Sequence, residues 1–87
     1  MKIDITGHHI NITDALNSYT KSKFKRLKKY SEYITNIHVI LTVEKARMRA
    51  EAKLKIKHGN LFAVDEQDNM YAAIDEIIEK LDKQLKK

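Results

Sequence analysis

Residues 46–57, ARMRAEAKLKIK, alternate strictly between apolar and charged side chains, and this pattern constrains the fold more than any other feature of the chain. Successive side chains of a β-strand point to opposite faces of the sheet, so a period of two predicts a strand. The apolar row predicts a buried face, and the row of five basic residues and one acid predicts a face in water. The sheet is therefore expected to be covered on one side only.

Three further segments are predicted to be strands. Residues 2–6 alternate between polar and apolar side chains, and Gly7 is expected to end this first strand. Residues 37–43, IHVILTV, are rich in β-branched side chains, which favour a pleated surface. Residues 58–60 supply a turn, after which residues 61–65 are expected to form the last strand.

Two apolar stripes with helical spacing predict two helices. Thr13 is expected to cap a helix over residues 14–30, and Asp68 a final helix whose stripe runs from Met70 to Leu85. The predicted order is β-α-β-β-β-α. We therefore expect an α+β fold with a four-stranded sheet and both helices packed on one face, as a single domain over residues 1–87.

The composition narrows the class of protein. The chain has 87 residues, no cysteine and a formal net charge of +5. The lack of cysteine excludes disulfides and thiolate chemistry and favours the cytoplasm. The N-terminus has no signal-peptide pattern, and no window approaches the ~18 apolar residues of a membrane span, so we expect a soluble protein without a membrane partner. The basic charge balance favours attraction to nucleic acid.

Residues 21–30, KSKFKRLKKY, carry six positive charges and no acid. Helical spacing places Lys21 and Lys28 on the outward side, where ordinary solvated lysines are an equally good explanation. Lys23 instead falls at the boundary of the buried face, where solubility alone does not require a lysine. A negatively charged partner is therefore one explanation of this segment.

Tyr19, Lys23, Arg26 and Tyr30 form a stripe at positions i, i+4, i+7 and i+11. Cations neutralise phosphates, and aromatic faces stack on unpaired bases or riboses. The stripe therefore predicts an RNA-binding surface in which Tyr19 and Tyr30 are candidate stacking residues. The alternative is that both tyrosines merely edge the core.

The final helix ends in a cluster of four lysines, Lys80, Lys83, Lys86 and Lys87. Three of them follow an acid by four positions, which predicts the ion pairs Glu76–Lys80, Glu79–Lys83 and Asp82–Lys86. A structural role for this end is therefore as good an explanation as RNA binding. Two further cations, Lys45 and Arg47, flank the turn before the third strand, where they are free to reach a partner.

The sequence contains no recognisable catalytic or metal motif. His8 and His9 are adjacent, so they diverge in an extended segment, and they share no ligand spacing with His38 or His58. No nucleophile with a base and no glycine-rich phosphate loop is present. We expect no metal, no cofactor, no small-molecule substrate and no enzymatic activity. A small hydrolase or nuclease that uses His8 or His9 is the catalytic alternative.

Five short motifs, spread over essentially the whole chain, resemble one family: ITGHHINITDAL at 5–16, KFxRL at 23–27, VEK at 43–45, MYAAID at 70–75 and KLxxQL at 80–85. These motifs resemble the ribosome hibernation-promoting factors, the family of ribosome-associated inhibitors and sigma-54 modulation proteins. The resemblance implies a fold similar to double-stranded-RNA-binding domains. It also implies binding to intact ribosomes and to the 16S-type rRNA of the small subunit, in the mRNA channel near the A and P sites. Such binding would block mRNA and tRNA and keep idle ribosomes inactive.

By motif, the family's functional positions fall on Lys23, Arg26, Lys45, Lys80, Lys83 and Gln84. Lys28 and Lys29 are extra, so their role rests on charge alone. Asn69 stands where an acid often precedes the Met-Tyr pair. The chain lacks the second, dimerising domain of the long form, so it resembles the short type, which assists ribosome pairing; a truncated long form is the alternative.

The predicted RNA-binding residues, besides Tyr19 and Tyr30, are Lys21, Lys23, Arg26, Lys28, Lys29, Lys45, Arg47, Lys80, Lys83, Gln84, Lys86 and Lys87. If about six cations contact phosphates, log affinity should fall against log salt with a slope near −4 to −5. Two rival functions stay open. A generic structured-RNA module would bind isolated duplexes as well as ribosomes, and a protein-interaction module would tolerate charge reversal at Lys23 and Arg26.

Overall fold

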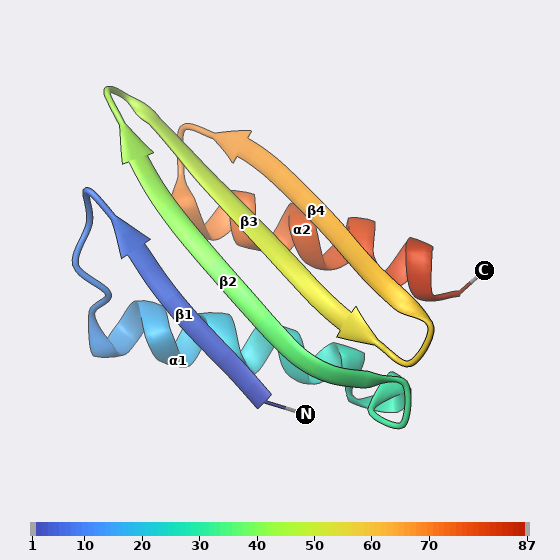
Figure 1. Ribbon diagram of the computed structural model, residues 1–87. Helices are drawn as coiled ribbons and strands as arrows, with labels where there is room; N and C mark the ends of the chain where they lie inside the picture. The colour runs from blue at the N-terminus through green and yellow to red at the C-terminus, as the bar shows by residue number, and fades with distance from the viewer. Residues whose placement is uncertain (1, 87) are drawn as a thin grey trace.

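The computed structural model describes residues 2–86 as a four-stranded sheet with two helices on one face (Figure 1). The elements are β1 (Lys2–His8), α1 (Asp14–Phe24), the 3-10 helix η1 (Lys25–Tyr30), β2 (Ile34–Glu44), β3 (Arg47–Ile56), β4 (Gly59–Gln67) and α2 (Met70–Leu85). The strand order is β1-β2-β3-β4, with β1 parallel to β2 and the other pairs antiparallel. The predicted α+β class and element order are confirmed.

The strands are longer than their patterns predicted. β1 continues through Gly7 to His8, because the parallel register pairs the whole strand with Asn36–Thr42. β2 begins at Ile34, which pairs with Ile56 of β3. Gly7 therefore does not end the strand. A Cβ at this position would meet the backbone oxygen of Ile10, so glycine is needed for the following loop to lie close against the strand.

The sequence predicted one continuous helix over residues 14–30, but the structure divides this segment into two helices of different type. The segment changes after Phe24 to the 3-10 helix η1. Phe24, Leu27 and Tyr30 are three residues apart, and a 3-10 helix has three residues per turn, so its geometry aligns these side chains on one face. Phe24 and Leu27 are fully buried, and Tyr30 packs partly buried against the core.

The two N-caps differ in how well the sequence predicted them. Thr13 caps α1 as expected, with its Oγ1 accepting from the Leu16 N–H at 3.1 Å. The cap of α2 is Asn69 and not Asp68: its Oδ1 accepts from the Tyr71 N–H at 2.8 Å and the Ala72 N–H at 3.3 Å. Asp68 and Asn69 have about the same preference for the N-cap position, so the sequence alone does not show at which of the two the helix begins.

The core lies between the sheet and the two helices. Its fully buried side chains come from every layer and include Phe24, Leu27, Ile37, Val39, Leu41, Ala50, Ala52, Leu54, Ile74, Ile77, Ile78 and Leu81. The alternate side chains of β2, β3 and β4 point to the other face, which no element covers in Figure 1. The predicted division of the sheet into a buried face and an open face is confirmed.

Candidate RNA-binding surface

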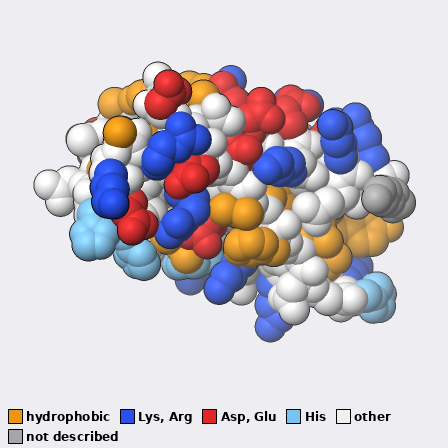
Figure 2. Space-filling view, turned by 90° about the horizontal axis from the view of Figure 1, so that it is seen from above, with side chains coloured by type: hydrophobic (Ala, Val, Ile, Leu, Met, Phe, Trp, Pro, Cys, Tyr) orange, Lys and Arg blue, Asp and Glu red, His pale blue; other side chains and the backbone are white. Residues whose placement is uncertain are grey.

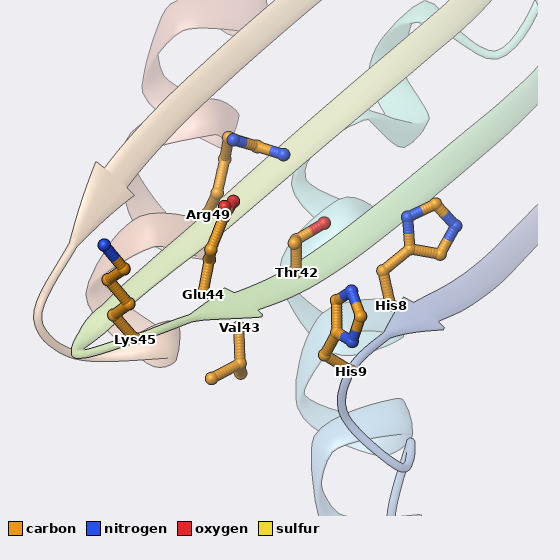
Figure 3. Close-up of a pocket in the computed structure, with 7 residues that line it drawn as sticks. All are labelled: His8, His9, Thr42, Val43, Glu44, Lys45 and Arg49. Carbon is orange, nitrogen blue, oxygen red and sulfur yellow. The ribbon is translucent and has the colours of Figure 1, made fainter.

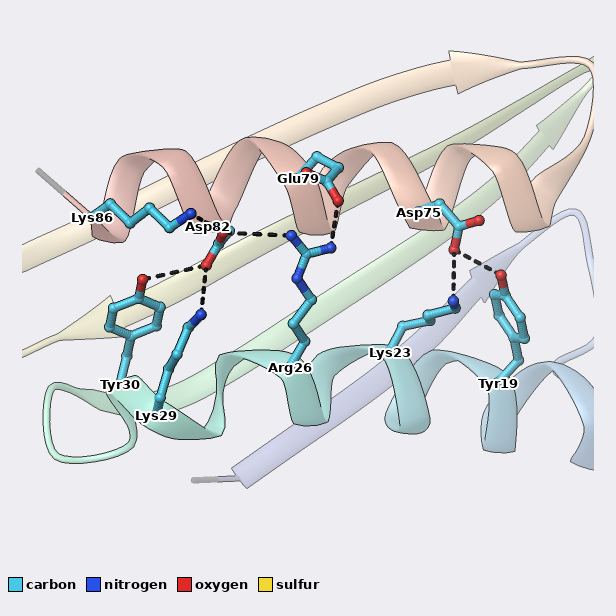
Figure 4. Close-up of polar contacts among 9 residues, drawn as sticks. All are labelled: Tyr19, Lys23, Arg26, Lys29, Tyr30, Asp75, Glu79, Asp82 and Lys86. Atoms are coloured by element: carbon cyan, nitrogen blue, oxygen red, sulfur yellow. Dashed lines mark hydrogen bonds and ion pairs between the residues drawn. The ribbon is translucent and has the colours of Figure 1, made fainter.

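The predicted stripe of tyrosines and cations faces a row of acids on α2. Because α1 and α2 run in the same direction, residues spaced i, i+4 and i+7 on both helices meet in the same order (Figure 4). The contacts join side chains of α1 and η1 to those of α2, and we call this set the inter-helix network: Tyr19, Lys23, Arg26, Lys29, Tyr30, Asp75, Glu79, Asp82 and Lys86.

Lys23 and Arg26 are each paired with a carboxylate of α2. Lys23 Nζ lies 3.7 Å from Asp75 Oδ1, and Arg26 forms an ion pair with Glu79 while its Nη2 lies 3.5 Å from Asp82 Oδ2. The hydrogen bond with Glu79 raises the pKa of Arg26 and lowers that of Glu79. Lys23 and Arg26 therefore have partners within the protein, and their contact with RNA stays a prediction.

These pairs are nevertheless exchangeable. The side chains of Lys23 and Arg26 are 45% and 46% exposed, and those of Asp75 and Glu79 are exposed to a similar degree. Ion pairs in such an environment contribute little to stability because water already solvates both charges. A phosphate oxygen can therefore replace either carboxylate at small cost.

Asp82 is the buried centre of the network. It is 2% exposed, and its carboxylate lies 3.1 Å from Lys86 Nζ and 3.7 Å from Lys29 Nζ, and accepts from the Tyr30 hydroxyl at 3.3 Å. The hydrogen bond from Lys86 lowers the pKa of Asp82, with Lys29 contributing, so the group stays ionised near neutral pH. Three cations, including Arg26, therefore converge on one fixed negative charge.

The two tyrosines of the stripe have partners within the protein. The Tyr19 hydroxyl donates to Asp75 at 2.7 Å, and this bond, together with burial and the Asp75 charge, raises the pKa of Tyr19 to about 12. The Tyr19 and Tyr71 rings meet edge-on, with their centroids 4.6 Å apart. Lys23 Nζ lies 5.3 Å from the centroid of the Tyr19 ring. Lys29 Nζ lies 5.5 Å from the Tyr30 centroid. Stacking on bases stays a prediction, and it requires these lysines to move.

Lys80 and Gln84, from the KLxxQL motif, bind the backbone of β4. Lys80 Nζ donates to the Val64 carbonyl at 2.7 Å and to Asp65 Oδ1 at 3.1 Å, and Gln84 Nε2 donates to the Phe62 carbonyl at 3.1 Å. Since β4 is an edge strand, these donors occupy carbonyls that would otherwise be open to a strand of another molecule. The structure thus gives both residues a structural role, whether or not they also touch RNA.

The local ion pairs predicted on α2 are only partly correct. Lys86 pairs with Asp82, as expected. Glu79 instead pairs with Arg26, and Lys80 with Asp65, so the Glu79–Lys83 and Glu76–Lys80 interpretations are wrong. The i,i+4 rule considers a helix alone, whereas partners on a neighbouring helix or strand compete for the same charges.

Four cations of the predicted set have no carboxylate within ion-pair distance among residues 2–86: Lys21, Lys28, Lys45 and Lys83. All four are exposed. Lys45 stands in the β2–β3 turn with a positive φ of 56°, while Arg47 donates to the Glu66 carbonyl and lies 3.9 Å from its carboxylate. Figure 2 shows basic and acidic side chains interspersed over one face of the molecule. Lys87 lies outside the described residues.

Sequence reasoning missed the role of the acids in this surface. Asp75, Glu79 and Asp82 are spaced i, i+4 and i+7, the same spacing as Tyr19, Lys23 and Arg26, and that match was the available signal. Within residues 2–86, no group of three or more His, Cys, Asp or Glu side chains is arranged to hold a metal ion. The described helices include none long and apolar enough to cross a membrane.

Comparisons with known proteins agree on one family. A family model described as Sigma 54 modulation protein / S30EA ribosomal protein matches residues 3–87. The ribosome hibernation promoting factor of Azotobacter vinelandii is 42% identical over 85 residues, which cover 98% of this chain and 79% of that protein. The factor of the same name from Escherichia coli (strain K12) is 40% identical over 87 residues, which cover 100% of this chain and 92% of that protein.

Two solved structures share the fold. A ribosomal subunit interface protein from Coxiella burnetii matches with a TM-score of 0.93 and 32% identity, covering 99% of this chain and 94% of that one. The N-terminal domain of Thermus thermophilus Protein Y matches with a TM-score of 0.92 and 31% identity, covering 99% and 97%. The fold, the motifs and the sequence relatives therefore all indicate the same protein family.

Proposed function

Because this chain belongs to the Sigma 54 modulation protein / S30EA ribosomal protein family, which includes the ribosome hibernation promoting factors, we propose that it acts by binding the ribosome. Members of this family are binding proteins and not enzymes. This chain binds the small ribosomal subunit, in the channel for mRNA and tRNA near the A and P sites. Bound there in the cytoplasm, it blocks translation, stabilises inactive ribosomes and assists their pairing.

The observation that carries this proposal is the surface of the parallel helices α1 and α2. Three exposed lysines on the same helices as the inter-helix network have no carboxylate partner within residues 2–86: Lys21, Lys28 and Lys83. The cations of the network itself are held in exchangeable pairs. Phosphate contacts of this kind supply affinity without reading a base sequence. Such contacts suit a protein that occupies a channel of fixed RNA structure.

The network also sets how its cations meet RNA. Arg26 presents a planar guanidinium, which binds phosphate through two parallel hydrogen bonds, once Glu79 releases it. Asp82 stays buried and ionised, so it holds Lys29 and Lys86 close together at the end of the helices. A phosphate bound at this end therefore meets a pre-arranged pair of ammonium groups.

The test is co-sedimentation with purified small subunits, intact ribosomes and a free RNA duplex. The test variant carries Lys21→Gln, Lys28→Gln and Lys83→Gln, which remove these three exposed cations of the helix surface. The matched control carries Lys53→Gln, Lys55→Gln and Lys57→Gln, which remove the same charge from exposed lysines of β3 and the following turn. We expect the helix variant to lose at least about tenfold in small-subunit affinity and the control to lose much less.

Three outcomes would contradict the proposal in different ways. Equal losses in both variants would mean that net charge, and not the helix surface, drives binding. Equal binding to free duplex would favour a general structured-RNA module. An absence of ribosome binding at low salt would favour the protein-interaction module.

A further inference from the structure

The open face of the sheet has an apolar centre that no element within residues 2–86 covers. Phe62 is 46% exposed and Val64 is 38% exposed, and the two side chains follow each other on this face of β4. Half-buried Ile40 of β2 lies on the same face, because Ile40 and Val64 pair with Glu51 from its two sides. None of these three apolar side chains belongs to the core cluster or packs against it. Exposed apolar side chains that lie together inside a charged rim are typical of an interaction surface.

The charges of this open face are nearly balanced, unlike those of the whole chain. The strand register places five cations on the face: Lys2, Arg47, Arg49, Lys53 and Lys55. It places four acids there: Asp4, Glu44, Glu51 and Glu66. The face therefore carries one net positive charge of the chain's +5. Two faces of this kind can approach each other without strong repulsion.

The two sides of the sheet are clearly separated at the end of this face nearest the β2–β3 turn. Figure 3 shows Thr42, Glu44 and Arg49 pointing to one side of the sheet and Val43, which packs against the core, to the other. The charged groups of the open face are thus directed away from the helices. Whatever docks on this face does not compete for the inter-helix network.

A second copy of the same face matches its pattern. Two sheets that pack face to face lie ~10 Å apart, with their strands within about 30° of each other. A two-fold axis between the sheets, crossing the strands midway between Phe62 and Val64, places each Phe62 on Val64 of the second copy. Because Lys53 pairs with Phe62 and Glu51 with Val64, the same axis places each Lys53 opposite Glu51 of the second copy. One operation therefore makes both the apolar and the charged contacts complementary.

We propose that the free protein forms a homodimer through the open faces of its sheets. Phe62, Val64 and Ile40 form the centre of the interface, flanked by the two Lys53–Glu51 pairs. Lys55 comes beside Arg49 of the second copy, whose charge is balanced by the neighbouring Glu66 and Glu51.

The size of the open face sets the strength of this dimer. Four strands of about nine residues cover roughly 600 Å² per copy, from the usual strand spacing and rise. This area is less than the ~800 Å² per partner of a standard interface, so the dimer is weak and reversible. Both helix surfaces lie on its outside, so this inference does not depend on the proposed ribosome binding.

The test is sedimentation velocity of the free 87-residue protein, without ribosomes or nucleic acid, at about 5 to 500 μM, a range suited to a weak interface. We expect the mass to rise from that of one chain toward that of two. NMR spectra over the same range should show concentration-dependent shifts of the backbone amides of residues 38–40, 51–53 and 62–64. The amides of α1 and α2 should not shift.

A matched pair of truncations tests the apolar centre. Phe62→Ser should weaken the dimer at least about tenfold, because it removes an aromatic side chain at the middle of the interface. Tyr33→Ser removes a ring that is 57% exposed but lies outside the strands, and it should change the dimer affinity less than about twofold.

A charge exchange tests the two-fold arrangement. Lys53→Glu and Glu51→Lys each place like charges opposite each other, so each variant alone should dimerise at least about tenfold more weakly. When the two variants are mixed in equal amounts, every contact between them joins opposite charges again, and a heterodimer should recover most of the affinity. Glu51→Lys also removes the ion pair with Arg49, so a thermal melt checks that each variant is folded.

The proposal is overturned if the protein stays monomeric up to about 500 μM, or if Tyr33→Ser weakens the dimer as much as Phe62→Ser does. It is also overturned if the two folded charge variants do not recover on mixing. Amide shifts confined to the helices or to β1 would overturn it as well, because the copies would then associate through another surface. Since no ribosome is present, failure of the dimer and failure of ribosome binding are distinguishable.

Discussion

The carboxylates of α2 should limit the salt dependence of RNA binding, because they neutralise cations that RNA would otherwise contact. The test variant carries Asp75→Asn and Glu79→Gln, which release Lys23 and reduce the carboxylate contacts of Arg26. A cation that exchanges a carboxylate for a phosphate causes little net release of counterions, so it adds little to the salt dependence of binding. A cation that has no carboxylate partner adds the full slope of one phosphate contact.

The structure gives the expected magnitude. Among residues 2–86, four cations of the predicted set have no carboxylate partner, and at about 0.7 to 0.9 per contact they give a slope of about −2.8 to −3.6 for the unmodified protein. This value is shallower than the sequence-based estimate. Full release of Lys23 steepens the slope by about 0.7 to 0.9, and partial release of Arg26, which keeps Asp82, raises the total to at most about 1.8. Over a fourfold rise in salt, the variant should therefore lose about three- to twelvefold more affinity than the unmodified protein.

The assay is co-sedimentation with small subunits across a salt series. The matched control carries Glu32→Gln and Glu76→Gln, which change the net charge equally at exposed acids that have no ion-pair partner among the described residues. If the control steepens the slope as much as the test variant does, the ion pairs of the network do not sequester cations, and the reasoning is refuted.

Three further perturbations test the structure itself. Gly7→Ala should destabilise the fold by about 1 to 3 kcal/mol, because its Cβ meets the Ile10 carbonyl and lies 3.0 Å from Ile12 Cδ1; a thermal melt that is unchanged would contradict this. Gln84→Met should cost about 1 kcal/mol, or ~4–8 °C in melting temperature, by leaving a β4 carbonyl without its donor. Tyr19 should ionise near pH 12, so its contribution to stability is full below the unfolded pKa of about 10 and is lost as the pH rises from there to 12. An absorbance titration compared with Tyr19→Phe reads this directly, and ionisation of Tyr19 near pH 10 would contradict it.

The fold was predictable because its signals are local. Strict alternation in residues 46–57 and the apolar stripe from Met70 to Leu85 determine which faces are buried, and the structure buries those faces. The boundaries were less predictable. The extension of β1 past Gly7 depends on its pairing with β2. The change from α-helix to 3-10 helix after Phe24 depends on packing that the local sequence does not encode.

The candidate surface was predictable only in composition. The sequence shows which cations belong to it, but their partners come from another helix, so a rule for single helices assigned Glu79 to Lys83 when Arg26 holds it. Asp82 was paired correctly with Lys86 because that contact is local. Its burial and its contact with Lys29 depend on how the helices pack. Spatial relations between distant segments therefore account for most of what the sequence missed.

The parallel pairing of β1 with β2 also bears on how the chain folds. The strands β2, β3 and β4 are joined by tight turns and can form as a local meander. β1 pairs residues such as Lys2 with Asn36 and needs α1 in place as the crossover between them. Contacts between distant residues form slowly, because the loop must close before the contact stabilises it. The first strand to be synthesised is therefore expected to be the last to join the sheet.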